Sequence, residues 1–208
     1  MNKPGGYDNI HRDLMHELAE VDLAAAAEAL DLSINPAGQV EILFMGVKYL
    51  LDNDGIRRED DRDYRNTHES ILAGYVIRHS LGEASGRFVS FDSITGMVPA
   101  QGSYTNTALE ARLVKYAEDD PDRFHDAIIQ SGGLPGGETG SGGTSWIVRL
   151  LPKISIQLIF YAGDEEFPSN IRLLIEDSAT TFLEFEFLAV LTSIFIEEVI
   201  KRFPASIT

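Results

Sequence analysis

The sequence contains no cysteine among its 208 residues. Disulfide bonds, thiolate catalysis and zinc sites built on thiolates are therefore excluded, and so is an iron–sulfur cluster ligated by this chain. If the protein serves such a cluster, we expect it to do so through a partner iron–sulfur protein.

Basic residues are also scarce. The chain has 17 lysines and arginines against 33 aspartates and glutamates, which gives a formal net charge of −16. A chain with this charge repels a phosphate backbone, and no basic patch in the sequence offsets the repulsion. Nucleic acid is therefore not an expected partner.

Long apolar runs are missing as well. The longest uncharged apolar stretch, Phe187 to Ile196, is too short to span a bilayer, and the first residues lack the apolar core of a signal peptide. We expect no membrane partner and a cytoplasmic location.

Hydrophobic residues make up 44% of the chain, which is enough for one good core, so a single domain over residues 1–208 is expected. Apolar residues at three- and four-residue steps predict an amphipathic helix over residues 8–30, with Asp8 as its cap. Two short strands are predicted around Gly46. The mixed charges from Asp52 to Arg65 are typical of an exposed loop.

Capping signals and apolar periodicity predict four further helices and one more strand. The helices are expected to begin at the pairs Asn66/Glu69 and Thr107/Glu110, at Asp120-Pro121 and near Glu184. The first should end at Gly82, the third at Gly132 and the last near Phe203, and a strand is expected at Phe88–Phe91.

Seven glycines fall within residues 132–143, which predicts a flexible loop because ordering glycine costs more backbone entropy than ordering other residues. The stretch from Gly137 to Thr144 has the glycine spacing of a phosphate-binding loop, yet Gly143 occupies the lysine position and no strand is predicted before it. Nucleotide binding is therefore not expected. We interpret the segment as a linker or a lid that frames a site.

A β-hairpin is predicted from two alternating apolar runs. Ile154 to Tyr161 and Ile171 to Glu176 alternate with the period of a strand, and the Gly163–Pro168 segment between them is a turn. The turn contains Asp164, Glu165 and Glu166, which could hold a cation, bind a donor-rich ligand or keep the hairpin end soluble. We expect Asp164 to cap the turn and the two glutamates to be exposed.

The hairpin and its acidic turn resemble an uncharacterised domain family of anaerobic bacteria and archaea, sometimes fused behind an iron–sulfur segment. The resemblance runs through Leu151-Pro152, the strand to Tyr161, the Gly163–Pro168 turn and Leu188 to Leu191, and more weakly through Phe44–Tyr49 and Phe88–Phe91. The chain departs from the family pattern at Ser155, Tyr161, Glu184 and Phe187. The resemblance implies no activity, but it implies the company of corrinoid and iron–sulfur metabolism.

Three further residues are candidates to contact a cofactor. His79 continues the inward stripe of the helix that begins at Asn66, so it could line a pocket beneath the sheet, although core packing would place it equally well. Trp146 and Tyr161 stand at the ends of predicted strands, where they could stack on a planar cofactor or fill the core. No spacing of histidines and carboxylates matches a known metal motif, so no metal site is predicted.

These observations predict an α+β fold, with a small, mainly antiparallel sheet packed against N- and C-terminal helices and a helical insertion in the middle. The expected function is a non-catalytic cofactor-binding or accessory protein, with a corrinoid or similar tetrapyrrole as the possible cofactor. Its candidate cofactor-binding residues are His79, Trp146, Tyr161, Asp164, Glu165 and Glu166. The alternatives are an enzyme based on carboxylates or a metal, and an interaction module for an iron–sulfur protein.

Overall fold

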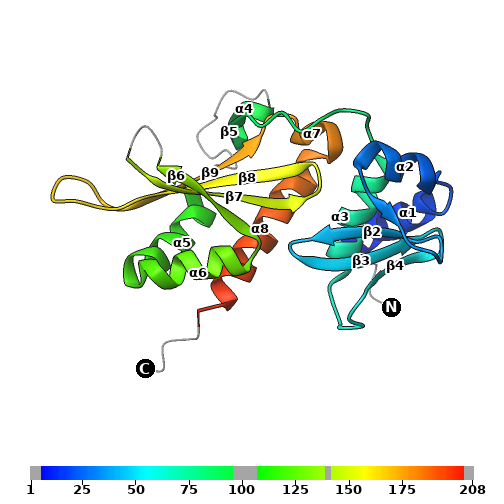
Figure 1. Ribbon diagram of the computed structural model, residues 1–208, viewed down its shortest axis with the longest axis horizontal. Coiled ribbons are helices and arrows are strands. Elements are labelled where there is room, and N and C mark those ends of the chain that lie inside the picture. The colour runs from blue at the N-terminus through cyan, green and yellow to red at the C-terminus, as the bar shows by residue number, and fades with distance from the viewer. Residues whose placement is uncertain (1–5, 96–106, 139–141, 204–208) are drawn as a thin grey trace.

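The computed structural model describes residues 6–95, 107–138 and 142–203, which form two lobes side by side (Figure 1). The N-terminal lobe contains α1 (Gly6–Leu18), α2 (Leu23–Leu30), β1 (Ser33–Ile34), β2 (Val40–Phe44), β3 (Val47–Asp52), β4 (Gly55–Arg58) and α3 (Asn66–Ile77). The C-terminal lobe contains β5 (Phe88–Ser90), α4 (Phe91–Thr95), α5 (Thr107–Asp119), α6 (Pro121–Gln130), β6 (Gly133–Glu138), β7 (Thr144–Leu151), β8 (Ile154–Tyr161), β9 (Asn170–Glu176), α7 (Ala179–Phe182) and α8 (Phe185–Lys201).

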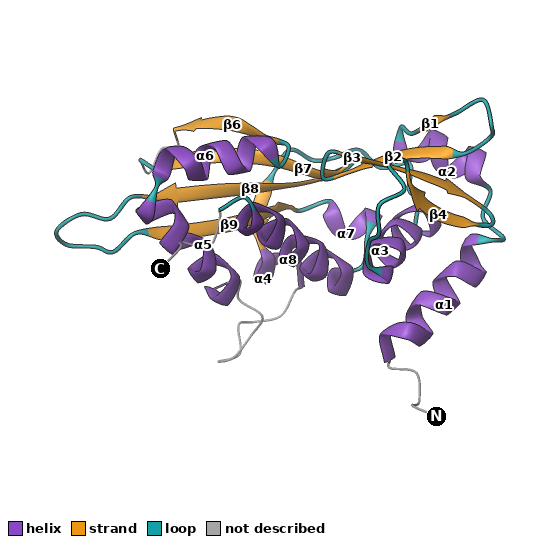
Figure 2. Ribbon diagram, turned by 90° about the horizontal axis from the view of Figure 1, so that it is seen from below, coloured by secondary structure: helices purple, strands orange, loops and turns teal. Residues whose placement is uncertain are grey.

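Each lobe has its own antiparallel sheet. The strand order is β1-β2-β3-β4 in the first and β5-β9-β8-β7-β6 in the second. The predicted α+β class is confirmed, with two sheets in place of a single small one. Helices α3 and α8 lie on the same side of the two sheets (Figure 2), and α5 and α6 form the predicted helical insertion between β5 and β6. Among the described residues, no helix is long and apolar enough to cross a membrane.

The predicted hairpin of β8 and β9 is confirmed, and it buries the predicted face. Ile156 pairs with Ile175 and Leu158 with Leu173, and these side chains are buried on the helix side of the sheet. The strands around Gly46 and the helix α8 are confirmed too. Local apolar periodicity was sufficient at these places because each element buries one continuous face.

The predicted single helix over residues 8–30 is wrong, because the chain breaks between α1 and α2. Asp22 caps α2 by accepting hydrogen bonds from Ala24 N and Ala25 N at 3.1 Å. The side-chain amide of Asn53 contacts the carbonyl oxygens of Leu18 and Ala19 at 3.1 Å, which satisfies the end of α1. Asp8 lies in the first turn of α1 instead of preceding it.

Two predicted loops contain strands. Residues 55–58 form β4, which pairs with β3 within the expected loop from Asp52 to Arg65. Residues 133–138 of the glycine-rich segment form β6, an edge strand paired with β7, while residues 139–141 lie outside the described part of the chain. Flexibility of the rest of this segment stays a prediction.

Helices α3 and α5 begin at the predicted residues Asn66 and Thr107, but the capping predicted for α3 is wrong. Helix α3 begins at Asn66 with Arg65 as its cap, ends at Ile77 well before Gly82, and has no side-chain cap bond. Glu110 of α5 accepts a hydrogen bond from Leu173 N at 2.8 Å, where β9 extends beyond its neighbour β5. The Thr107 side chain lies outside the described residues. Asp120 does cap α6, through Arg123 N at 3.0 Å.

The lobes meet at the turn between β2 and β3. Met45 and Gly46 both have positive φ values, 50° and 78°, as expected for a two-residue hairpin turn. Met45 N donates to Leu150 O of β7 at 3.3 Å, so the tip of this hairpin docks on the other sheet. Lys153 joins the lobes as well, because its backbone N donates to the Tyr75 hydroxyl of α3 at 3.1 Å.

Candidate functional site

Two cavities lie at the lobe junction, on opposite faces of β2 and β3. We call the first the front cavity; it has a volume of ≈ 460 Å³ and is lined by Asp31, Leu32, Ser33, Glu41, Ile42, Leu43, Gly46, Lys48, Gly132, Arg149 and Pro152. We call the second the junction cavity; it has a volume of ≈ 310 Å³ and is lined by Phe44, Met45, Val47, Tyr49, Arg58, Arg62, Asp63, His68, Ser131, Ile194, Phe195, Glu198 and Arg202. Successive strand residues point to opposite faces, so Leu43 and Phe44 belong to different cavities.

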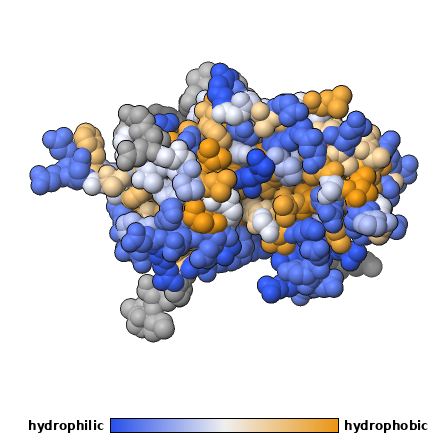
Figure 3. Space-filling model, in the orientation of Figure 1, coloured by the Kyte–Doolittle hydropathy of each residue, from blue (hydrophilic) through white to orange (hydrophobic). Residues whose placement is uncertain are grey.

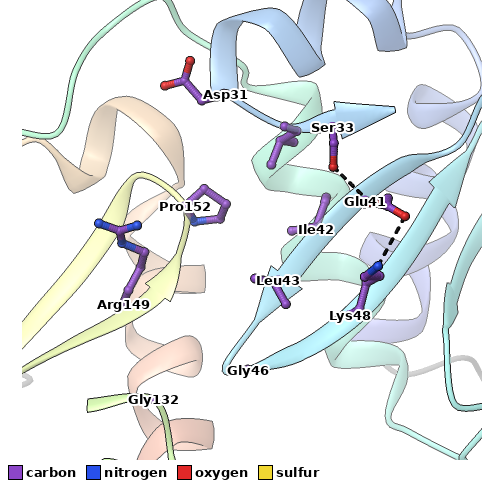
Figure 4. A pocket seen from close by; sticks show the side chains of 11 residues that line it. Asp31, Ser33, Glu41, Ile42, Leu43, Gly46, Lys48, Gly132, Arg149 and Pro152 are labelled. Atoms are coloured by element: carbon purple, nitrogen blue, oxygen red, sulfur yellow. Dashed lines mark hydrogen bonds and ion pairs between the residues drawn. The ribbon is translucent and has the colours of Figure 1, made fainter. Parts of the chain in front are cut away.

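The front cavity is open and its charges are balanced. Glu41 accepts hydrogen bonds from Ser33 Oγ at 3.0 Å and from Lys48 Nζ at 3.4 Å on one wall, and Arg149 lies on the other lobe (Figure 4). Figure 3 shows hydrophobic residues on both lobes of this face. The polar groups of the N-terminal wall already bind one another, so the front cavity offers few free groups to a ligand.

The junction cavity contains a hydrogen-bonded pair of ring side chains. Tyr49 of β3 and His68 of α3 meet with the phenol oxygen 2.9 Å from Nδ1. Phe44 packs against both rings, with ring centroids 5.7 Å from Tyr49 and 5.1 Å from His68. The sheet and the helix thus place an aromatic wall and a titratable group on one cavity.

Burial determines the protonation of this pair. It lowers the pKa of the His68 imidazole and raises the pKa of the Tyr49 phenol to about 12. Both side chains are therefore uncharged at neutral pH. Among the described residues, Nδ1 is the one acceptor within hydrogen-bond distance of the buried Tyr49 hydroxyl, so we assign the phenol as the donor of this bond. The imidazole proton then resides on Nε2, where it is a hydrogen-bond donor.

Arginine side chains from both lobes line the same cavity. Arg58 of β4 binds both carboxylate oxygens of Asp60, at 2.9 and 2.8 Å, and lies over the Tyr49 ring at 5.9 Å. Arg202, which follows α8, donates from Nε to Ser131 Oγ at 2.9 Å. Residues more than 140 positions apart in the sequence therefore meet here.

A second hydrogen-bond network lies behind the aromatic wall. The Tyr64 hydroxyl is 2.6 Å from Ile56 O and 2.8 Å from Glu69 Oε1, and Glu69 Oε2 is 2.5 Å from His11 Nε2. The Tyr64 ring stacks on His68 with centroids 6.1 Å apart. This network fixes α1, β4 and α3 relative to one another and so holds His68 in place.

The predicted acidic turn lies at the far end of the C-terminal lobe. Asp164 Oδ1 accepts hydrogen bonds from Glu166 N and Phe167 N, both at 2.8 Å, which confirms that Asp164 caps the turn. Glu165 and Glu166 are exposed, as expected. The turn projects beyond the sheet (Figure 1), and its surface is mostly hydrophilic (Figure 3).

The other candidate residues lie apart from the turn and from each other. His79 Nδ1 is 2.9 Å from Val76 O at the end of α3. Trp146 is buried against α6 and donates to His125 Nδ1 at 3.0 Å. Trp146 pairs with Leu158, so the two side chains lie on the same face of the sheet. Tyr161 is three residues after Leu158 on β8, and its side chain therefore points to the opposite face. The six residues do not form one site, and binding by any one of them stays a prediction.

Sequence reasoning missed the junction cavity. His68 belongs to no metal motif and so was not a candidate, and Arg58 fell within the segment interpreted as an exposed loop. The available signal was the dense arginine content of residues 57–65, which is unusual in so acidic a chain. Among the described residues, no group of three or more metal-ligating side chains is placed to hold a metal ion.

One comparison with known proteins gives a match. A family model described as a domain of unknown function (DUF3786) matches residues 22–198, which is most of the chain. No curated protein and no solved structure matches it. The matched region contains Tyr49, Arg58 and His68 but ends before Arg202.

Proposed function

This chain belongs to the DUF3786 family, and we propose that it is a non-catalytic protein that binds a small organic ligand or cofactor in the junction cavity. The observation that carries the proposal is the lining of this cavity. Aromatic rings, an uncharged histidine and arginines from both lobes converge on a space of ≈ 310 Å³. Ligand sites in proteins have this character, with an apolar wall and a few convergent polar groups.

The size of the cavity bears on the kind of ligand. It stands at the lower end of the range of about 300–1,000 Å³ that is typical of ligand pockets, so it suits a small molecule or one part of a larger one. A corrinoid or other tetrapyrrole is a broad macrocycle that this space cannot enclose. We keep a corrinoid within the proposal as a ligand that would insert one side arm and remain partly exposed between the lobes.

Thermal unfolding of the full chain with a ligand panel tests the proposal. The panel contains hydroxocobalamin, haemin, and small organic acids, amides and amines. A ligand that binds only the folded chain raises the midpoint in a saturable way. Val47→Phe, which fills the junction cavity, should abolish the rise, whereas Leu43→Phe on the opposite face should not. The proposal fails if no compound raises the midpoint or if Val47→Phe leaves the rise intact.

A second candidate function rests on the Tyr49–His68 hydrogen bond. An uncharged imidazole whose Nε2–H group faces a cavity can donate a hydrogen bond to a bound ligand and polarise it, so we also consider an enzyme in which His68 acts as a hydrogen-bond donor or general acid. In this candidate function the reacting side chain lies in the junction cavity, and not in the acidic turn. Turnover of a bound ligand by the wild type, lost in His68→Gln with binding retained, would support the enzyme over the binding protein.

A partner protein is a further candidate, at the acidic turn. Phe167 is 68% exposed at the tip of the projecting hairpin, beside Glu165 and Glu166, and could anchor a contact with an iron–sulfur protein. Recovery of such a partner from the native host with the wild type, but not with Phe167→Ser, would support this role. Equal recovery with both forms would contradict it.

A further inference from the structure

We infer that the ligand of the junction cavity carries a carboxylate or phosphate group, which lies between His68 Nε2 and the Arg202 guanidinium, while its apolar body packs on Phe44, Val47 and Ile194. This inference rests on the proposed function and names the chemical class of the ligand. The inference is supported by two hydrogen-bonding side chains of the lining, His68 and Arg202, whose remaining donors have no partner among the described residues.

His68 supplies the first donor. The Tyr49 hydroxyl donates to Nδ1 at 2.9 Å, so the uncharged ring carries its proton on Nε2. The charged groups that act on the ring are Glu198 and Lys201 from α8, Arg58 from β4 and Arg65 before α3. Burial has the largest effect and lowers the pKa of the ring, Arg58, Arg65 and Lys201 lower it as well, and Glu198 raises it. The ring therefore stays uncharged, and its Nε2–H group requires an acceptor on the ligand.

Arg202 supplies the second set of donors. Its Nε donates to Ser131 Oγ, and Ser131, which is 2% exposed, in turn donates to Ala127 O at 2.7 Å. Although Arg202 as a whole is exposed, this bond to a buried serine holds its Nε at the wall of the cavity. Its two terminal nitrogens have no partner among the described residues, and two parallel N–H groups match a carboxylate or phosphate.

The other charges of the cavity are largely compensated within the protein. Arg58 binds Asp60 through two hydrogen bonds, and Glu198 lies 2.5 Å from Lys201. Arg62 and Asp63 are both exposed at the rim and have opposite signs. The free groups with fixed positions are therefore His68 Nε2 and Arg202, and both are donors.

The apolar part of the lining determines the chemistry of the ligand's uncharged body. Phe44 and Phe195 are buried side chains of the two lobes, and Val47 and Ile194 lie beside them. A small planar or aliphatic body fits between these residues. A free inorganic anion would leave the apolar lining without a contact, so we expect an organic acid or a phosphate monoester to bind more tightly than inorganic phosphate.

Calorimetric titration of the full chain tests the inference with four probes: benzoate, phenyl phosphate, inorganic phosphate and benzamide. Benzamide has the body of benzoate but no charge. We expect dissociation constants on the order of 1 mM for benzoate or phenyl phosphate and binding roughly tenfold weaker or more for benzamide, because charge-assisted hydrogen bonds are lost. Binding of the anions should also weaken as salt is raised.

Two variants with the same loss of charge locate the anion. Arg202→Gln should weaken benzoate binding roughly tenfold or more. Arg149→Gln, on the opposite face of the molecule, should leave it unchanged. In the wild type, benzoate should also shift the Nε2 nitrogen resonance of His68, a readout that does not depend on the folding of any variant.

The possible failures are distinct. Equal binding of benzamide and benzoate would overturn the anion assignment and leave the ligand-binding function standing. Equal weakening by Arg149→Gln and Arg202→Gln would show a general effect of charge and overturn the location. If neither organic anion binds at millimolar concentration, the assignment is wrong, and the wider ligand panel decides whether the cavity binds anything.

Discussion

At the scale of single residues, burial makes the Tyr49–His68 pair sensitive to pH. Burial lowers the pKa of His68 in the folded chain, so the unfolded chain takes up this proton first as pH falls below the usual value of about 6.5. The stability contributed by His68 is therefore complete above that pH and is lost as pH falls through the folded pKa.

We predict that the thermal midpoint of the wild type falls more steeply between pH 7.5 and 5.5 than that of His68→Gln. Glutamine keeps a polar side chain at this position but does not titrate, so the contributions of all other groups cancel in the comparison. Parallel pH profiles would contradict the prediction.

Asp164 is a structural carboxylate on an otherwise solvated turn. Its hydrogen bonds to Glu166 N and Phe167 N lower its pKa and hold the turn that leaves β8. We predict that Asp164→Ala lowers the thermal midpoint and that Glu165→Gln with Glu166→Gln does not. An Asp164→Ala variant as stable as the wild type would show that the turn needs no cap.

At the scale of elements, Gly133 of β6 serves close packing. A Cβ atom at Gly133 would lie 2.5 Å from Ile128 Cγ2 and 2.9 Å from Ile128 O, so α6 packs against the bare backbone of β6. We predict that Gly133→Ala lowers the free energy of unfolding by about 1–3 kcal/mol, as overpacking does. Denaturant titration measures the change.

Gly74 of α3 is the matched control, because a Cβ atom there would make ordinary contacts of 3.6 Å with Leu183 and Phe187. We predict that Gly74→Ala raises the free energy of unfolding by roughly 0.5–1 kcal/mol, since alanine is the better helix former. If Gly133→Ala were equally stabilising, packing would not require a glycine at position 133.

At the scale of the whole molecule, Lys153 connects the two lobes. Its side chain is 6% exposed, and its Nζ donates to Gly82 O at 3.0 Å, lies 3.1 Å from Asp31 and stands over the Phe182 ring at 6.0 Å. Asp31 and Glu83, its ionic partners, are themselves exposed. The buried ammonium is therefore the part of this contact that the fold depends on.

We predict that Lys153→Met lowers the free energy of unfolding by about 1–3 kcal/mol, because Gly82 O loses its donor. Asp31→Asn and Glu83→Gln should each change it by less than about 1 kcal/mol, as is usual for exposed ion pairs. Lys201→Met, at a lysine that is 60% exposed, is the control. A loss at Lys201 as large as that at Lys153 would refute the special role of the buried lysine.

Composition and local pattern by themselves determined much of the fold. Alternation placed β8 and β9, apolar content placed α8, and the acidic turn indicated Asp164 as its cap. These features depend on residues within a few positions of one another, so the sequence alone contains their cause. The absence of cysteine and the charge of −16 likewise constrain the chemistry without reference to the fold.

The tertiary structure decided the break between α1 and α2, the strands β4 and β6, and the candidate site. Asn53 ends α1 from a distant turn. The strands β4 and β6 have no apolar period of their own, and each forms through its hydrogen bonds to a neighbouring strand. The junction cavity joins Tyr49 and His68 to Arg202, across most of the length of the chain. No local pattern encodes that meeting, because it is produced by the packing of one lobe against the other.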